Sequence, residues 1–387
     1  MTGHAHAARE AGKPHAYGLP MPRRRFTLPV FALALLLSAA TANAAYRDLS
    51  PSAEVAKQIR SPATLNPVWT RNITASDASS AIAAWSDATG SLRVYVADTD
   101  NGRVLAFDGA SGEPVPLDTG SGLSTPTALF AIDDLLFVVE RDSRRVQAFA
   151  LPALQPLGTV GEGGLIQPTS LFARQADVDS YLLYVGDDYD NDGNVPPDRD
   201  LNRRVKSYLV TLHRDANAAP ESVSAERVGQ IGETSGDGVV RRMGALGGDA
   251  FYDHLLIGER DRGHDSGYRV YGFAGKYRNA SLGQELFRRG PADIALRACD
   301  SGGGHWLASD SGGDEDANSP LLVMDRASLR PIGAFTLGSG TVDSLWFQNG
   351  KSPAFPSGLL FARQGNRLVA IDWRDIAREL RLDPACR

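Results

Sequence analysis

The sequence predicts an all-β chain, more specifically a six-bladed β-propeller with a short C-terminal helix. The first observation behind this prediction is a recurring unit: a β-branched strand, an acidic residue, a polar turn rich in Gly, Asp and Asn, and a second strand that usually ends with an aromatic side chain. Turns of that composition between alternating apolar runs are typical of β-hairpins. The unit occurs at residues 92–108, 135–149, 181–210, 255–273, 305–324 and 359–371.

The second observation is that helical periodicity is almost absent outside residues 373–382. Further apolar strands fit between successive hairpins, which indicates four-stranded blades, and a radial arrangement of such blades leaves no long open edge. A β-sandwich explains the sequence less well, because it does not predict the same short pattern in every repeat. The propeller domain is predicted to span residues 74–387.

Residues 1–44 have the features of a signal peptide. Three arginines at 23–25 precede an apolar run at 30–37, and Ala42-Asn43-Ala44 offers a small-x-small cleavage site. The apolar run is too short to span a bilayer, and no later stretch reaches about 18 apolar residues. We therefore expect export to the periplasm or the extracellular space, by the general or the twin-arginine route, with an anchor by an uncleaved signal left open. Residues 45–73 are expected to supply a lead-in or blade-closing strand.

The charge balance and the cysteine count narrow the classes of partner. The chain has 40 basic and 46 acidic residues, and without the predicted leader, which holds five basic and one acidic residue, its net charge is −10. Such a field repels nucleic acids and anionic lipids and favours small cations as partners. We also expect a monomer without stable membrane insertion, whose partner is a small phosphorylated substrate or another, unidentified ligand. In an exported chain, Cys299 and Cys386 permit one disulfide, and two unpaired thiols are the alternative.

An acidic residue follows the first strand of almost every hairpin. Residues at matching places in successive blades lie at matching radii, so these side chains are candidates for a ring. If the ring converges on the central channel, its crowded carboxylates require a cation such as Ca²⁺. Alternatively, each carboxylate accepts hydrogen bonds from its own loop. The residues are Asp98, Glu140, Asp187, Glu259 and Asp310, with Arg363-Gln364 in the sixth repeat.

The insert of the third repeat contains a second candidate for calcium. Residues 187–193 place Asp188, Asp190 and Asp192 at every second position before a glycine, which is the opening pattern of a calcium loop. The twelfth position of that pattern is Arg199, so the glutamate of an EF-hand is missing, and a solvated acidic loop is the alternative. The predicted metal ligands are Asp187, Asp188, Asp190, Asp192, Glu140 and Asp310.

Basic side chains are candidates for binding an anionic ligand, because arginine donates parallel hydrogen bonds to phosphate. The alternative is that each is a surface residue, which an isolated arginine is more often than it is a binding residue. A nucleophile elbow, a paired-cysteine metal motif and a phosphate-binding glycine loop are all missing from the sequence. The basic groups are Arg141, Arg144 and Arg145; Arg203, Arg204 and Lys206; and Arg241 with Arg242.

Residues 74–382 resemble the β-propeller phytases, calcium-dependent phosphomonoesterases that act on inositol hexakisphosphate. The resemblance rests on residues 132–149, 195–208, 232–238, 306–311 and 355–376. It implies that channel carboxylates hold calcium, which bridges the substrate phosphates and activates water. It also implies that Arg141 binds phosphate, that Glu259 is an acidic site residue at the end of a strand, and that Asp343 corresponds to the aspartate of a Thr-Asp-Gly turn. By this resemblance Glu259, Asp343 and Arg141 are the predicted catalytic residues. Arg144 and Arg203 are predicted to contact substrate phosphate as well.

The sequence departs from that family at the motifs that build its site. Paired acids before a tryptophan are replaced by Ser79-Ser80, an expected glutamate by Gly244, and the Pro-Glu-Gly-Ile strand by residues 291–294, which include Asp293. Two hypotheses follow. The chain is an exported, phytase-like phosphomonoesterase whose activity is weakened or lost, or it is a non-catalytic binding or scaffold propeller that resembles the NHL type.

Overall fold

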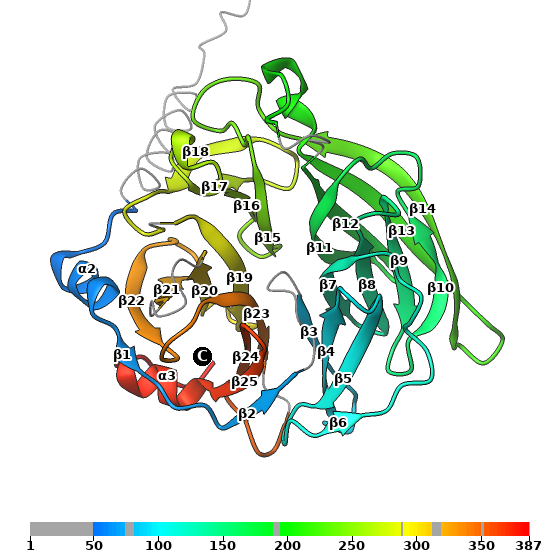
Figure 1. The fold of residues 1–387 in the computed structure, drawn as a ribbon, viewed down its shortest axis with the longest axis horizontal. Helices are drawn as coiled ribbons and strands as arrows, with labels where there is room; N and C mark the ends of the chain where they lie inside the picture. The colour runs from blue at the N-terminus through cyan, green and yellow to red at the C-terminus, as the bar shows by residue number, and fades with distance from the viewer. Residues whose placement is uncertain are drawn as a thin grey trace, which may run out of the picture. The chain divides into compact units, whose positions relative to one another are not determined.

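Six β-sheets are arranged as a ring in the computed structural model (Figure 1). The structure describes residues 49–73, 81–188, 194–287, 289–311, 319–349 and 352–386. Each sheet has four antiparallel strands, which follow one another from the centre of the ring outward. One sheet gains a fifth, parallel strand. The predicted six-bladed propeller is therefore confirmed, and every predicted hairpin forms the second and third strands of a blade.

The strands follow the chain from one blade to the next, with the inner strand first in each. Blade 1 contains β3 (Ile82–Ser86), β4 (Leu92–Asp98), β5 (Arg103–Asp108) and β6 (Pro114–Val115). Blade 2 contains β7 (Pro126–Ile132), β8 (Leu135–Glu140), β9 (Arg145–Ala150) and β10 (Gln155–Val160). Blade 3 contains β11 (Pro168–Asp177), β12 (Ser180–Asp187), β13 (Val205–Arg214) and β14 (Pro220–Ile231). Blade 4 contains β15 (Met243–Asp249), β16 (His254–Glu259), β17 (Gly267–Tyr271) and β18 (Tyr277–Leu282). Blade 5 contains β19 (Pro291–Ala298), β20 (Gly304–Asp310), β21 (Leu321–Asp325) and β22 (Pro331–Thr336). Blade 6 contains β23 (Val342–Gln348), β24 (Leu359–Gln364), β25 (Arg367–Asp372) and, from the N-terminal segment, β2 (Trp69–Asn72).

Short helices lie between or beside the blades. The predicted C-terminal helix is α3 (Trp373–Glu379), whose first turn is capped by Asp372 through the backbone N–H of Arg374 at 2.8 Å. The other helical elements are α2 (Ala53–Arg60), η2 (Asp198–Arg203) and η3 (Arg262–His264).

The hydrophobic core is divided into six clusters, and each lies between two neighbouring blades. Central strands with consecutive apolar residues make this possible, because a blade needs an apolar surface on both of its faces. Strand β8, for example, is buried at every position. The cluster between blades 2 and 3, for example, combines Phe137 and Val139 of β8 with Leu183 and Val185 of β12, all fully buried. Every blade is thus held by its two neighbours, and the ring must be closed for the first and last blades to be covered.

The N-terminal segment closes the ring. Strand β2 pairs with β25, so one strand from the start of the chain completes the last blade. Its Trp69 donates a hydrogen bond to the carbonyl of Gly109 at 3.1 Å, and Arg71 donates to the carbonyl of Gly112 at 2.9 Å, which joins blade 6 to blade 1. Strand β1 (Ala63–Thr64) adds to β22 in parallel. Figure 1 shows this blue segment running along the orange and red blades.

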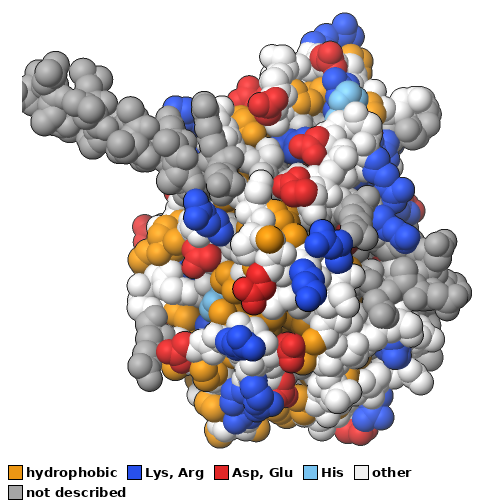
Figure 2. All heavy atoms as spheres, turned by 90° about the vertical axis from the view of Figure 1, so that its left-hand side faces the viewer, with side chains coloured by type: hydrophobic (Ala, Val, Ile, Leu, Met, Phe, Trp, Pro, Cys, Tyr) orange, Lys and Arg blue, Asp and Glu red, His pale blue; other side chains and the backbone are white. Residues whose placement is uncertain are grey.

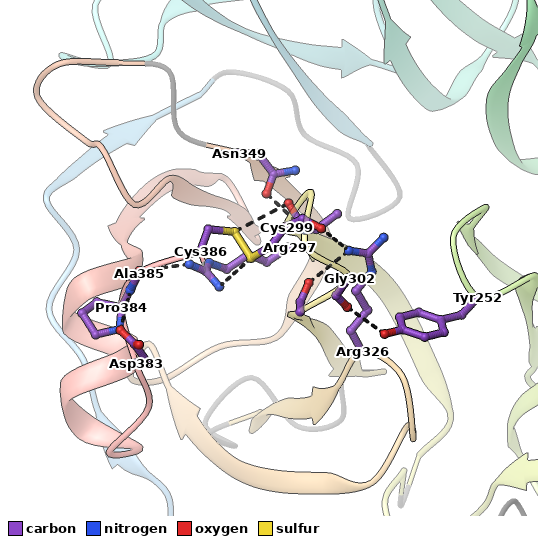
Figure 3. Close-up of a disulfide and its surroundings, with 12 residues drawn as sticks. Tyr252, Arg297, Cys299, Gly302, Arg326, Asn349, Asp383, Pro384, Ala385 and Cys386 are labelled. Atoms are coloured by element: carbon purple, nitrogen blue, oxygen red, sulfur yellow. Dashed lines mark hydrogen bonds between the residues drawn. A yellow bond between two sulfur atoms is a disulfide. The ribbon is translucent and has the colours of Figure 1, made fainter.

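A disulfide joins the C-terminal tail to the inner strand of blade 5. Cys299 and Cys386 are bonded, as the sequence permitted. Beside them Arg297, which is 2% exposed, donates to the carbonyl of Pro384 at 3.0 Å (Figure 3). Its guanidinium group also lies 4.4 Å from the ring centre of Trp373. The tail after α3 is therefore held by a covalent bond and by a buried arginine.

The outer side of the ring near α2 and β22 has acidic and basic side chains interspersed among apolar ones, as Figure 2 shows. Charges of both signs therefore neighbour one another on this side. In the part of the chain that the structure describes, no helix combines the length and the apolar character that crossing a membrane requires.

Candidate functional site

The residue that ends the second strand of each blade is a buried acid or amide. These are the positions that the sequence singled out as a possible ring: Asp98, Glu140, Asp187, Glu259, Asp310 and, in blade 6, Gln364. Because the inner and second strands are antiparallel, this residue lies beside the start of the inner strand of its own blade in blades 2 to 6.

Backbone groups that lead into the inner strands occupy these side chains. Glu140 accepts from the N–H of Ser124 at 2.9 Å, and Asp187 accepts from the N–H of Gln167 at 2.6 Å. Glu259 accepts from the backbone N–H groups of Arg241, Arg242 and Asp261, at 2.5, 3.0 and 2.7 Å. In blades 5 and 6, Asp310 accepts from the N–H of Arg289 at 3.1 Å, and the Gln364 amide donates to the carbonyl of Ser339 at 2.9 Å. These five residues fix the loops before the inner strands. The alternative left open by the sequence expected each acid to bond to its own loop, and Glu259 does so as well, through Asp261.

Basic side chains at the start of the third strand add a second partner in three blades. Arg103 lies 2.8 Å from Asp98, Arg145 lies 2.6 Å from Glu140, and Lys206 forms an ion pair with Asp187. Burial raises the pKa of Glu259, although its three backbone N–H donors oppose this effect. Calcium binds six to eight oxygen ligands, and carboxylates already engaged by N–H groups and cations do not fit that need. The described residues contain no group of three or more His, Cys, Asp or Glu side chains placed to hold a metal ion.

The calcium loop predicted in the third repeat is only partly described. Asp190 and Asp192 lie outside the described residues. Asp188, the first ligand of the predicted pattern, is 2% exposed and lies among arginines. Calcium binding by this insert stays a prediction.

The centre of the ring holds a cavity of about 960 Å³ that is lined by all six inner strands. Its charged lining, among the described residues, consists of three arginines and three aspartates. All six lie at the end of the ring where the inner strands begin, because they either follow a second strand directly or stand near the start of an inner strand. They are Arg141, Arg242, Arg260, Asp188, Asp293 and Asp343.

Asp188 is the centre of an arginine cluster, a name we use for Arg204, Arg242 and Arg260. Arg204 is fully buried and pairs directly with the Asp188 carboxylate. The guanidinium groups of Arg242 and Arg260 lie 3.5 and 3.6 Å from the same carboxylate, and 30% and 45% of their side chains are exposed. Three guanidinium groups thus share the Asp188 carboxylate, and the buried Glu259, which directly precedes Arg260, places a second negative charge near this wall of blades 3 and 4.

Asp293 and Asp343 place negative charge on blades 5 and 6 of the same cavity. Asp293 accepts from the hydroxyl of Ser344 and the N–H of Leu345, both at 2.8 Å, which joins the inner strands of the two blades. Burial raises the pKa of Asp293 to about 6 in spite of these hydrogen bonds. Asp343 accepts from the hydroxyl of Thr341 at 3.0 Å.

We expect the change in the free energy of unfolding from pH 4 to pH 7 to be more positive in the Asp293→Asn variant than in the wild type. The native state binds more protons at Asp293 than the unfolded state between about pH 4 and pH 6, so its contribution to stability falls as the pH rises through that window. A pKa raised from 3.8 to about 6 corresponds to about 3 kcal/mol at most.

The measurement is urea unfolding at pH 4 and pH 7, compared as a difference between the two pH values, because asparagine also changes the hydrogen bonds. Asp118→Asn, at an exposed position, is the matched control and should behave as the wild type. Equal pH dependence in wild type and Asp293→Asn would contradict the expectation.

The structure places the sequence-predicted site residues in two groups. Arg141, Asp188 and Asp343 line the cavity, where Arg242, Arg260 and Asp293 join them. Of these three, Arg260 had no sequence signal of its own, although it directly follows Glu259 in the repeat. The predicted residues that are not among the cavity lining are Glu140, Asp187, Glu259 and Asp310, which bond to loops; Arg144, which is exposed in a turn; and Arg203, which pairs with Asp200 in η2.

No protein-family model matches the chain, and no curated protein sequence does. Among solved structures, the chain is similar to a chain of the nidogen/laminin complex, with 15% identity and a TM-score of 0.42 over 66% of this chain and 79% of the other. It is also similar to U3-55K, with 13% identity and a TM-score of 0.47 over 79% and 99%. A gluconolactonase from Xanthomonas campestris gives 13% identity and a TM-score of 0.46 over 78% and 88%.

Proposed function

We propose that the protein binds a small organic phosphate in its central cavity, with the phosphate group against Arg242 and Arg260. The observation that carries this proposal is the arginine cluster, in which three guanidinium groups converge on the carboxylate of Asp188. Arg242 and Arg260 face the cavity, and both are partly exposed there. Planar guanidinium groups that donate paired hydrogen bonds are well suited to phosphate oxygens. Arg141 adds a further positive charge to the lining.

Replacing Arg260 by glutamine is expected to weaken phosphate binding by about tenfold or more, because a charge-assisted hydrogen bond contributes about 1.5–3 kcal/mol. Isothermal titration calorimetry with inorganic phosphate measures the effect. Arg199→Gln is the matched control, because the Arg199 side chain is 84% exposed and is not among the cavity lining. Equal affinities of wild type and Arg260→Gln, or no phosphate binding by the wild type, would overturn the proposal.

Hydrolysis of phosphate monoesters is the second candidate function. It is supported by the two aspartates that share the cavity with the arginines, and by the resemblance that assigns Asp343 to a catalytic position. In this reaction a water oxygen bonds to phosphorus, the ester P–O bond breaks, and the leaving oxygen receives a proton, so that inorganic phosphate and an alcohol result. Asp343 is the residue that we propose accepts the proton of the water. The ring acids do not fit calcium as they are placed, so this candidate assigns them no step.

The assay for hydrolysis is phosphate release by the purified chain, with inositol hexakisphosphate and phenyl phosphate as substrates, each in the presence of Ca²⁺ and of a chelator. Release that Asp343→Ala abolishes would support the enzyme. If the wild type releases no more phosphate than the Asp343→Ala variant, hydrolysis is rejected and binding of an organic phosphate is the function that stands. Dependence on Ca²⁺ would support the predicted calcium-dependent, phytase-like activity.

Export is part of the proposal. The predicted signal peptide lies outside the described residues, but the Cys299–Cys386 disulfide supports function in an oxidising compartment such as the periplasm or the extracellular space.

A further inference from the structure

The inner strands place an aromatic cluster in the cavity, below the charged end. Strand register identifies six equivalent positions, one on each inner strand. Each pairs with the residue of the second strand that stands three positions before the buried acid or amide. Three of these positions hold large aromatic side chains and three hold Ala or Gly. The residues are Ala83, Phe130, Phe172, Gly247, Ala295 and Trp346.

The three aromatic rings form one contiguous surface. The Phe130 ring centre lies 5.2 Å from that of Phe172 and 5.2 Å from that of Trp346, both with edge-to-face geometry. All three side chains line the cavity, and Phe130 and Trp346 are partly exposed. The cavity therefore has a positively charged wall at one end and aromatic faces deeper inside.

The neighbouring strand fixes the position of Phe172. A Cβ atom at Gly248 would lie 2.2 Å from Cε1 of the Phe172 ring, so no side chain fits at Gly248 while the ring holds its place. Close packing of this kind gives an aromatic surface that is formed before any ligand binds, which lowers the entropic cost of binding.

The charged lining limits the charge of the ligand. The described lining residues include three arginines and three aspartates, so their formal charges cancel. A ligand with many phosphates would bring far more negative charge than the arginines can neutralise, and it would leave phosphates against aromatic rings. A single phosphate satisfies the arginine side of the cavity and leaves the deeper part for an apolar group.

We propose that the ligand of this cavity is an aryl phosphate: one phosphate bound by Arg242 and Arg260, and an aromatic body packed against Phe130 and Trp346. The proposal rests on the proposed function, because it assumes that the arginines bind the phosphate. A cavity of about 960 Å³ is at the upper end of the usual range for small-molecule sites, so a bicyclic aromatic body fits its size. Aromatic rings gain affinity both from buried area and from edge-to-face contacts.

Calorimetry on the wild-type chain compares inorganic phosphate, phenyl phosphate, 1-naphthyl phosphate and inositol hexakisphosphate. We expect 1-naphthyl phosphate to bind at least tenfold more tightly than inorganic phosphate, with phenyl phosphate between them. We expect inositol hexakisphosphate to bind no more tightly than inorganic phosphate. If inorganic phosphate binds as tightly as the aryl phosphates, or inositol hexakisphosphate binds most tightly, the inference is overturned while the proposed function stands.

Variants separate the two parts of the site. Phe130→Leu and Trp346→Leu are each expected to weaken 1-naphthyl phosphate by at least fivefold and to leave inorganic phosphate unchanged, whereas Arg260→Gln weakens both ligands. Phe251→Leu is the matched control, because Phe251 is 59% exposed and is not among the cavity lining. An unchanged affinity for 1-naphthyl phosphate in both aromatic variants overturns the inference. Failure of every phosphate compound to bind the wild type overturns the proposed function itself.

Discussion

Replacing Asp188 by asparagine is expected to lower the free energy of unfolding by about 3–5 kcal/mol, since removal of one partner leaves buried charge uncompensated. Asp188 is 2% exposed, and its carboxylate pairs with the fully buried Arg204. It also accepts from the backbone N–H of Met243 at 3.2 Å, at the start of an inner strand. Asparagine keeps the shape of the side chain but removes the negative charge that the three guanidinium groups of the arginine cluster share.

Sulfate or phosphate should restore part of the stability lost in Asp188→Asn. An oxyanion that binds the three arginines of the native state stabilises it by mass action, and the gain should be larger in the variant than in the wild type. Urea unfolding with and without 50 mM sodium sulfate, against sodium chloride at equal ionic strength, measures the difference. Asp118→Asn is the matched control for the loss of one exposed acid. A loss below about 1 kcal/mol, which is typical of surface ion pairs, would show that the carboxylate does not compensate buried charge.

The hairpins could be predicted because their signal is local. Alternating apolar residues and a polar turn fall within a single short stretch, and the same stretch repeats in each blade. Ring closure is different. Pairing of β2 with β25 joins the two ends of the chain, and no periodicity within residues 69–72 states which partner the strand will take. The sequence could therefore predict a lead-in or blade-closing strand and not its sheet.

In blades 2 to 5 the cavity is lined by the residue after the buried acid of the repeat. The sequence predicts Arg141 and Asp188 as site residues on other grounds, whereas it does not predict Arg260. The repeat draws attention to Glu140, Asp187 and Glu259, which are buried and bond to loops, while the residues that follow them line the cavity. Successive residues of an extended chain point to opposite sides, and a repeat in the sequence does not state which side faces the channel.

The residues after the buried acids are also less uniform. They are Arg141 in blade 2, Asp188 in blade 3, Arg260 in blade 4 and Ser311 in blade 5. A structural residue recurs because every blade needs the same loop fixed, whereas a ligand is asymmetric and needs different groups around it. The residue after the buried acid, which differs from blade to blade, is therefore a better signal for a ligand site than the acid that recurs in the repeat.

Removing the disulfide by the double substitution Cys299→Ser and Cys386→Ser is expected to lower the free energy of unfolding by about 2–5 kcal/mol. The two cysteines are 87 residues apart in sequence, so the bond restricts a long loop of the unfolded chain. Without it the tail after α3 is held mainly by Arg297, whose pKa burial lowers to about 10. If the tail separates, that buried guanidinium loses the Pro384 carbonyl, which adds an unsatisfied donor to the loss of the covalent bond.

Urea unfolding of the oxidised wild type, the reduced wild type and the double variant tests this expectation. The reduced wild type and the variant should unfold at the same urea concentration, and reductant should leave the variant unchanged. Phosphate affinity should be equal in oxidised and variant protein, because the arginine cluster lies on blades 3 and 4, whereas the disulfide joins blade 5 to the tail. A variant as stable as the oxidised wild type would mean that packing of α3 and β1 against blade 5 holds this end of the chain without the covalent bond. Closure would then depend on β2 and the N-terminal segment alone, and the cysteines would have to be explained by something other than stability.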